Sequence, residues 1–413
     1  MKRLIKAIKF IGYSFLAFFI TANLYIVLSG KFYIYKGVAN TYLVGETGPS
    51  IYDLDVFPYE VIHFEASKTA KIKEHKAINS FLLTNKQRSR MENLGTKAFL
   101  VFKNDVLMYE EYWGGHTKET VSNSFSVAKT MVAMLIGIAI EDGAINSVED
   151  KVCDYLPDFC ENGKDKISIH HLLTMSSGLD WSESGKNPLS DNAESYYGSN
   201  LYSHVLGQSV ESSPGKVFRY QSGNSQLLGY ILEAATKQNL SDYAEDKIWK
   251  KMGAEHDAFW SLDKENGDEK AFCCMYASTR DFARLGMVLL NKGNFNNNQI
   301  ITSEFYNAMV TPVPLLTKEK IPNYRYGLHT WIYMDEQSKV NYFRGIKGQF
   351  IITIPDEEIV IVRIGDRRSP NFERDENWTE LELEKNKFKI GHPIGFDEYL
   401  ELGREILKST GLK

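Results

Sequence analysis

The sequence predicts an α+β fold in which strands from both ends of a domain form one antiparallel sheet flanked by helices. Residues 98–113 contain two β-rich runs around an Asn-Asp turn, which indicates a hairpin. Residues 349–364 contain two further runs around the turn at 355–358. Between the two hairpins, residues 150–310 are mostly helical in character with long loops. A single sheet with an inserted helical region accounts for this order.

The composition indicates an ordered globular chain. Its 413 residues are 43% hydrophobic and 13% aromatic, enough to bury a substantial core. The 48 basic and 53 acidic residues leave a net charge of only -5, so a nucleic-acid partner is not expected. The nine histidines show no HExxH or HxH spacing and no CxxC pair is present, so neither a metal nor another cofactor is expected.

Residues 1–30 form a predicted membrane anchor or signal segment. Four basic residues open it: Lys2, Arg3, Lys6 and Lys9. The uncharged stretch 10–30 is long enough to cross a hydrocarbon layer of ~30 Å. A signal peptide usually has a shorter apolar region and a small-residue cleavage site, which favours an uncleaved anchor over a cleaved, secreted form. The positive-inside rule then places the rest of the chain outside the cytoplasm, in the periplasm or at the cell surface.

The rest of the chain divides into a polar spacer at 31–79 and a domain at 80–413. The four cysteines give two expectations. Cys153 and Cys160 flank a short segment and either close a disulfide in an oxidising compartment or stay free. Cys273 and Cys274 are adjacent, a geometry that rarely forms a bridge, so buried thiols are expected.

The predicted chemistry centres on Ser126 and Lys129, which form an S-x-x-K pattern. The pattern recurs at 213–216 and 261–264, but the first of these is a Pro-Gly turn and the second a polar run. Only Ser126 opens a helix. Lys129 is the single charge in the apolar stretch 126–140, and a lysine in a buried helix requires an explanation.

A functional explanation is available for this lysine. A spacing of three places the hydroxyl and the amine on one helix face, and burial would lower the amine pKa from its usual value of about 10.4. Lys129 would then be a base near neutral pH. The helix N-terminus would favour an oxyanion beside Ser126. The alternative is an N-cap serine with a lysine that extends to the surface.

A second motif, Pro-Gly-Lys-Val-Phe-Arg-Tyr-Gln-Ser, ends at Ser222 and is followed by Leu-Leu-Gly at 227–229. This order of motifs resembles class C β-lactamases and their esterase and amidase relatives, in the serine β-lactamase and penicillin-binding superfamily. The resemblance implies that Tyr220 shares or relays the proton of Ser126 and delivers it to the leaving group, and that Ser222 contacts the substrate. A packing tyrosine is the alternative.

The resemblance covers about residues 95–370 and implies a β-lactamase/transpeptidase-like fold. Residues 169–179 resemble a family helix that ends in Ser-Gly-Leu, and residues 278–286 resemble its R-D-x-A-R-x-G helix. The nearby histidines His170 and His171 are interpreted as packing residues. For two further residues, pocket lining and core packing both remain open: His329 and Trp331.

The third family motif departs from the β-lactamase pattern. Where lactamases carry K-T-G on an edge strand, this chain has Ile346, Lys347 and Gly348. Strand alternation would point Lys347 to the opposite face, so the lysine that normally binds a substrate carboxylate is missing. Gly348 would let the substrate approach the backbone. The resemblance further implies oxyanion donors at the N–H groups of Ser126 and Gln349.

The G-I-x-G-Q form, together with Trp181-Ser-Glu183, is similar to the nylon-oligomer (6-aminohexanoate-dimer) hydrolase branch. Trp181 and Glu183 are therefore candidate substrate contacts, with a solvated loop acid as the alternative for Glu183. We expect a serine hydrolase that forms an acyl-enzyme with small-molecule esters or amides, and Ile346 suits neutral ones. The alternative is a penicillin-binding or sensor-type domain, a D-amino peptidase or a weak β-lactamase, which acylates with little turnover. No G-x-S-x-G elbow is present, which argues against an α/β-hydrolase.

Overall fold

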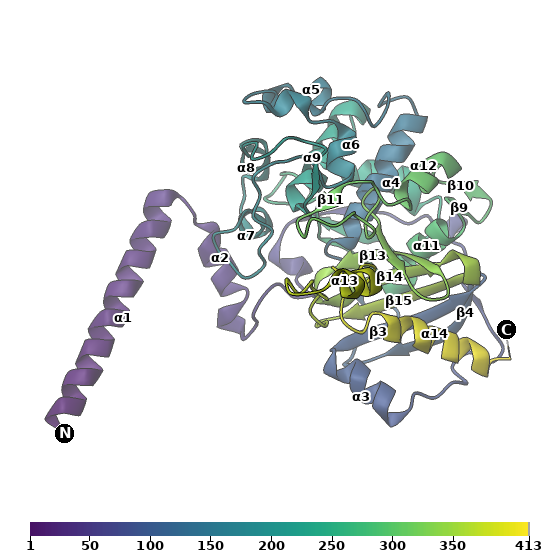
Figure 1. Ribbon diagram of the computed structural model, residues 1–413, viewed down its shortest axis with the longest axis horizontal. Coiled ribbons are helices and arrows are strands. Elements are labelled where there is room, and N and C mark those ends of the chain that lie inside the picture. Colours follow the sequence, from purple (N-terminus) through teal and green to yellow (C-terminus); the bar gives the residue numbers. More distant parts are fainter. Residues whose placement is uncertain (412–413) are drawn as a thin grey trace.

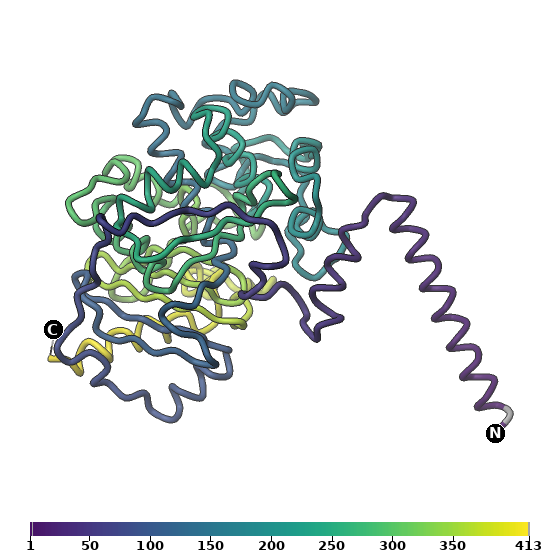
Figure 2. The backbone as a smooth tube through the Cα atoms, turned by 180° about the vertical axis from the view of Figure 1, so that it is seen from behind, coloured from purple at the N-terminus to yellow at the C-terminus, as the bar shows by residue number. Residues whose placement is uncertain are grey.

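A long N-terminal helix projects from a mixed α and β body in the computed structural model, which describes residues 1–411 (Figure 1). Helix α1 (Lys2–Ser29) stands away from the body in both views (Figures 1 and 2). It contains a stretch, Arg3–Ser29, that is long and apolar enough to cross a membrane. The body has sheets with helices on both sides, which confirms the predicted α+β class.

The main sheet joins strands from both ends of the domain. Its seven strands are, in spatial order, β12 (Trp331–Met334), β13 (Lys339–Gly345), β14 (Gln349–Ile354), β15 (Ile359–Gly365), β3 (Thr96–Lys103), β4 (Val106–Tyr112) and β2 (Lys73–Glu74). Neighbouring strands are antiparallel except β2 and β4. Both predicted hairpins are present, and β15 pairs with β3 at their junction, with Ile361 opposite Val101.

Each face of the main sheet is buried by its own hydrophobic core. Val360 and Val362 of β15 pack with α11 (Thr279–Leu290) in the larger core, which also contains α4. The alternate residue Ile361 packs on the other face with α14 (Asp397–Ser409). Burial on both faces explains why these strands are continuous apolar runs without polar alternation.

Between the two hairpins the chain is mainly helical. The helices there are α4 (Val127–Glu141), α5 (Val152–Tyr155), α6 (Ile169–Leu173), α7 (Asp191–Tyr197), α8 (Leu201–Leu206), α9 (Ser222–Thr236), α10 (Leu240–Ala244), α11 and α12 (Ser303–Met309). Helices α4 and α9 pack against each other at the centre. The remaining helices are α2 (Tyr33–Ala39) and α3 (Asn85–Asn93) before the first hairpin and α13 (Glu380–Asn386) after the second.

A second, four-stranded antiparallel sheet carries the turn that leads into α4. Its order is β1 (Tyr59–Ile62), β7 (Ala258–Ser261), β8 (Met275–Ser278) and β5 (Val121–Asn123). Two smaller sheets pair β9 (Asn294–Phe295) with β10 (Asn298–Gln299), and β6 (Val217–Phe218) with β11 (Leu316–Thr317).

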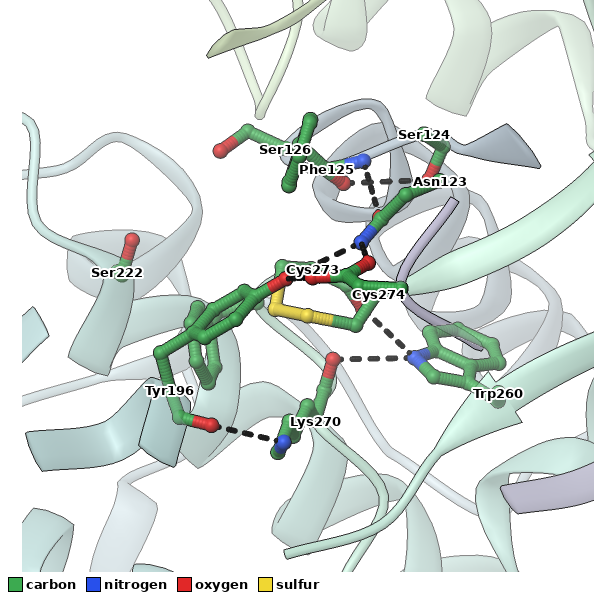
Figure 3. Close-up of a disulfide and its surroundings, with 12 residues drawn as sticks. Asn123, Ser124, Phe125, Ser126, Tyr196, Ser222, Trp260, Lys270, Cys273 and Cys274 are labelled. Atoms are coloured by element: carbon green, nitrogen blue, oxygen red, sulfur yellow. Dashed lines mark hydrogen bonds between the residues drawn. A yellow bond between two sulfur atoms is a disulfide. The ribbon is translucent and has the colours of Figure 1, made fainter. Parts of the chain in front are cut away.

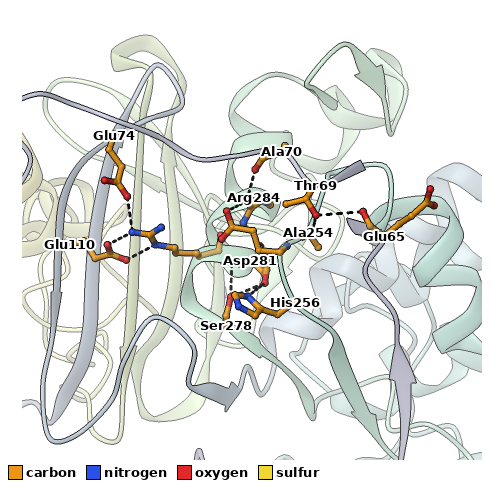
Figure 4. Close-up of polar contacts among 12 residues, drawn as sticks. Glu65, Thr69, Ala70, Glu74, Glu110, Ala254, His256, Ser278, Asp281 and Arg284 are labelled. Atoms are coloured by element: carbon orange, nitrogen blue, oxygen red, sulfur yellow. Dashed lines mark hydrogen bonds and ion pairs between the residues drawn. The ribbon is translucent and has the colours of Figure 1, made fainter. Parts of the chain in front are cut away.

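The segment 31–79 differs from the predicted spacer because it packs onto the domain. Ile51, Phe57 and Ile62 are buried in the larger core, and β1 completes the second sheet. Farther along, the Ala70 carbonyl accepts a hydrogen bond of 2.6 Å from Arg284 (Figure 4). Helix α11, which carries the R-D-x-A-R-x-G motif, therefore holds this segment against the domain. Isolated apolar residues in a polar stretch gave no periodic signal of this packing.

Both cysteine pairs are disulfide-bonded. The open question at Cys153 and Cys160 is resolved as a bridge, with the Cα atoms 5.3 Å apart. Cys273 and Cys274 are also bonded to each other, so the expectation of buried thiols is wrong. Cys274 has a left-handed backbone (φ 66°), a local conformation that brings the neighbouring side chains together and that the sequence does not reveal.

Candidate active site

Ser126 lies at the N-terminus of α4, at the end of a constrained turn. Strand β5 ends three residues earlier, and Phe125 takes a left-handed backbone conformation (φ 47°) that a bulky residue rarely adopts. The turn is stabilised on both sides: Asn123 Oδ1 accepts from the Phe125 N–H at 2.8 Å, and the Ser124 N–H donates to the Met275 carbonyl at 2.8 Å. The second sheet thus fixes the position of the Ser126 hydroxyl.

Lys129 reaches Ser126 as the spacing predicted. Its amine donates to Ser126 Oγ at 3.0 Å and to the Phe272 carbonyl at 2.5 Å, and the side chain is only 1% exposed. Burial lowers the pKa of this amine to about 8, although the charge of Glu183 raises it in part. A substantial neutral fraction is therefore present near neutral pH.

Tyr220 completes the group from a different part of the chain. It lies between β6 and α9, and its ring centroid is 5.4 Å from the Lys129 amine. Burial and then the charge of Glu183 raise the pKa of its phenol well above the usual value, while an interaction with the Ser126 side chain lowers it in part. The phenol is therefore neutral and able to donate a proton. The structure brings all three predicted catalytic residues together.

The carboxylate of Glu183 is held by hydrogen bonds within the protein, so the interpretation of Glu183 as a solvated loop residue is wrong. It accepts hydrogen bonds from Trp181 Nε1 at 2.8 Å, from the Ser222 N–H at 2.7 Å and from Ser222 Oγ at 2.6 Å. The acceptor therefore lies at the N-terminus of α9, where a negative charge is favourable. Ser222 itself is buried, and its hydroxyl is engaged with Glu183.

An open cavity of about 440 Å³ adjoins this group. Tyr220, Trp181 and Glu183 line it, and so does Trp331, whose ring centroid is 5.5 Å from that of Tyr220. Of the open alternatives, Trp331 thus lines a pocket. Cationic and anionic side chains also contribute to the wall: Asp180, Arg219, Lys318, Glu319, Arg325 and Glu373. This cavity is the candidate substrate site.

His329 belongs to the core and not to the catalytic group. Its ring nitrogens bond the Ser225 hydroxyl and the Leu173 carbonyl, both at 2.8 Å, and burial lowers its pKa to about 3. It therefore stays neutral. His171 accepts from the Ser168 N–H in the capping box of α6, in agreement with the predicted helix-packing role.

The stretch expected on an edge strand is instead a single turn of 3-10 helix, Ile346–Gly348, between β13 and β14. Strand alternation therefore does not set the direction of Lys347, whose backbone is left-handed (φ 60°) and whose amine lies 3.9 Å from Glu46. Ile346 is 45% exposed. A Cβ on Gly348 would meet Arg363 at 2.0 Å, so packing and the positive φ both favour glycine at this position.

The end of β13, just before this turn, lies close to the segment that leads into Ser126. A Cβ on Gly345 would meet the Ser124 carbonyl at 2.3 Å, and Gly345 pairs with Gln349. The Gln349 side chain is buried and bonds the carbonyls of Ile346 at 3.1 Å and Gly365 at 2.6 Å. Across residues 1–411, the N–H of Ser126 has no hydrogen-bond acceptor and is available as an oxyanion donor.

Support beneath Ser126 comes from residues that no local sequence pattern identifies. The buried carboxylate of Asp53 accepts from Asn123 at 3.1 Å, Tyr196 at 2.6 Å and Tyr276 at 2.8 Å. The bonded Cys273–Cys274 pair directly follows Phe272, whose carbonyl binds Lys129, and lies near Asn123 and Ser126 (Figure 3). These contacts join segments far apart in the chain.

Comparisons with known proteins match this arrangement. A family model described as Beta-lactamase matches residues 84–385, which include Ser126, Lys129, Tyr220 and the turn after β13. A 6-aminohexanoate-dimer hydrolase of Paenarthrobacter ureafaciens is 23% identical over 300 residues, covering 68% of this chain and 75% of that protein. The resemblance recognised in the sequence is confirmed.

Two solved structures share the fold. A Bacillus anthracis protein provisionally described as a 6-aminohexanoate-dimer hydrolase has a TM-score of 0.70 at 20% identity, covering 87% of this chain and 94% of that one. An octameric penicillin-binding protein homologue from Pyrococcus abyssi has a TM-score of 0.53 at 20% identity, covering 68% of this chain and 72% of that one.

Proposed function

Because this chain belongs to the beta-lactamase family, we propose that it is a serine hydrolase that cleaves small-molecule esters or amides through an acyl-enzyme on Ser126. The observation that carries the proposal is the contact of 3.0 Å between the Ser126 hydroxyl and a buried amine with a pKa of about 8. A neutral amine at this distance can accept the hydroxyl proton as the oxygen attacks.

In the first step, Ser126 Oγ bonds to the substrate carbonyl carbon and its proton passes to Lys129. The carbonyl π electrons move to oxygen, and the N–H groups of Ser126 and Gln349 stabilise this oxyanion. Collapse of the tetrahedral intermediate breaks the C–O or C–N bond. Tyr220 protonates the leaving alcohol or amine and recovers a proton from Lys129. Water then attacks the acyl-enzyme by the same route and releases the acid.

The substrate wall supports neutral acyl groups near the turn after β13. Ile346 occupies the place of the lysine that binds a carboxylate in lactamases, and its exposed side chain offers only an apolar contact. The 6-aminohexanoate-dimer hydrolase relative acts on an amide, which supports an amide as one substrate class. Trp331, which is 8% exposed, supplies a flat apolar part of the cavity wall for it.

We also propose that α1 anchors the enzyme in a membrane, with the domain outside the cytoplasm. The span Arg3–Ser29 has a mean hydropathy of 1.8 and is almost entirely free of contacts with the body. A cleaved signal peptide is the alternative. Two disulfides support an oxidising compartment.

The experiment is labelling with a fluorophosphonate probe followed by peptide mapping. We expect an adduct on Ser126 and none in Ser126→Ala. An adduct on Ser213 or Ser261 would contradict the assignment. A panel of esters, amides and a cephalosporin, followed for burst and steady state, then separates turnover from the alternative of an enzyme that acylates and stops.

A further inference from the structure

A group of exposed apolar side chains follows α1 directly. It lies on α2 and on the single turn Tyr42–Val44, and Leu43 is 76% exposed. Its members are Phe32, Tyr35, Val38, Tyr42, Leu43 and Val44. Residues 32–45 contain one charged residue, Lys36, and its amine is turned inward, 4.2 Å from the centre of the Phe57 ring. Water-facing surfaces rarely combine so many apolar side chains with no outward charge.

The fold places this group beside the outer end of α1. Helix α1 ends at Gly30, whose backbone is left-handed (φ 70°). Helix α2 then runs back beside the end of α1 (Figures 1 and 2). The reversal is fixed by a hydrogen bond of 2.7 Å from the Tyr35 hydroxyl to Asn23. The uncharged stretch 10–30 matches a hydrocarbon thickness of ~30 Å, so a spanning α1 would bring Gly30 to the outer edge of the bilayer. Residues 32–45 would then turn back toward the headgroups.

The same group is a rigid part of the catalytic body. Helix α2 packs on α7, where Lys31 pairs with Glu194 at 2.6 Å. Just beyond the apolar turn, Glu46 lies 3.9 Å from Lys347 in the turn after β13. The exposed Ile346 is the next residue. The apolar group is thus connected to the turn after β13, and this turn follows Gly345, which lies against the Ser124 carbonyl just before Ser126.

We propose that residues 32–45 form a membrane-contact surface that seats in the outer headgroup layer of the bilayer spanned by α1. The proposal rests on the membrane anchor and deepens the proposed function. Tyrosines among exposed aliphatic side chains are a composition that favours a bilayer interface. The turn after β13, beside the segment that leads into Ser126, then lies near the lipid surface. The favoured substrates are esters or amides that partition into the bilayer, and they reach Ser126 along it.

The first test measures depth and does not depend on activity. The full-length chain is reconstituted in phosphatidylcholine vesicles as Leu43→Trp and, as a matched control, as Leu381→Trp, since Leu381 is 80% exposed on α13. The six native tryptophans contribute equally to both variants. We expect lipids brominated near the glycerol to quench the added tryptophan at 43 at least twofold more than the one at 381.

Two outcomes of that test would overturn the proposal. If aqueous acrylamide quenches the tryptophan at 43 as strongly as the one at 381, and the brominated lipids do not quench it, the surface faces water. Protection at 43 from both quenchers means that protein covers the surface, either a second copy or a partner.

The second test concerns substrate delivery. Leu43→Asp and the control Leu381→Asp are compared on a water-soluble short ester and on a long-chain ester held in vesicles. We expect the soluble reaction to be unchanged in both variants and the vesicle reaction to fall at least fivefold in Leu43→Asp alone. Equal rates on the vesicle ester, or an equal fall on both substrates, overturns delivery from the bilayer. If the wild type hydrolyses neither ester, the proposed function fails while the quenching result stands by itself.

Discussion

Replacing Glu183 by glutamine should shift the pH dependence of hydrolysis to lower pH. Two opposing effects act on the pKa of Lys129: burial lowers it, and the negative charge of Glu183 raises it. Burial is the larger effect, and the resulting pKa is about 8. Glutamine removes the charge and leaves the burial. It can still accept from Trp181 Nε1 and the Ser222 N–H, and its amide can donate to Ser222 Oγ, so the local packing is retained.

The magnitude follows from the fraction of neutral amine. With a pKa of about 8, roughly 9% of Lys129 is neutral at pH 7, against about 0.03% for an ordinary lysine. Burial therefore makes the base about 300-fold more available at pH 7. In the wild type, kcat/KM should rise about tenfold from pH 7 to a plateau above pH 9. In Glu183→Gln the pKa of Lys129 falls below 8, so the plateau begins at a lower pH.

The assay is the initial rate on a neutral ester between pH 5 and pH 10. Asp180→Asn is the matched control, because Asp180 is an exposed acid in the wall of the same cavity and should leave the midpoint near that of the wild type. A midpoint in Glu183→Gln that equals or exceeds the wild-type midpoint would show that Glu183 does not act on the Lys129 charge, and the electrostatic reasoning would fail.

Four further predictions concern the same region. Lys129→Ala and Tyr220→Phe should each lower kcat by orders of magnitude, and the double variant should be little worse, whereas additive losses in kcat argue against a shared proton path. Lys129→Met should raise the free energy of unfolding at pH 7 by on the order of 1–3 kcal/mol, because the buried charge of Lys129 destabilises the fold below pH 8. This destabilisation disappears as the pH rises toward 10.5, so the difference between the two proteins should shrink. Urea unfolding at pH 7 and pH 10 measures both values. Ile346→Lys should raise kcat/KM for a carboxylate-bearing cephalosporin about three- to tenfold and should not raise kcat/KM for a neutral ester. The expected gain is at the low end for a charge-assisted hydrogen bond because position 346 is exposed to solvent. Asp53→Ala should lower the free energy of unfolding by about 2 kcal/mol or more, since three donors lose their acceptor, while exposed Asp55→Ala should change it little; equal losses would contradict the role of Asp53.

The sequence predicted the elements whose signals are local. The strands of residues 98–103 and 359–364 are buried on both faces, which leaves a continuous apolar run, and Lys129 is the single charge in an apolar helix. Ser126 and Lys129 could be predicted as a candidate site for this reason. Other features depend on contacts that no local pattern records. Isolated apolar residues anchor segment 31–79, and the direction of Lys347 depends on a positive φ.

The position of Asp53 and β1 has a consequence for how the enzyme could be released or produced. Cleavage after Gly30 would remove α1 and leave every contact of Asp53 with the nucleophile turn in place. Cleavage just after Ile62 would instead remove both Asp53, the acceptor beneath Asn123, and β1, an edge strand of the second sheet. A recombinant chain that begins near residue 80 would contain Ser126, Lys129 and Tyr220 but would lack Asp53 and β1, which support the turn before Ser126.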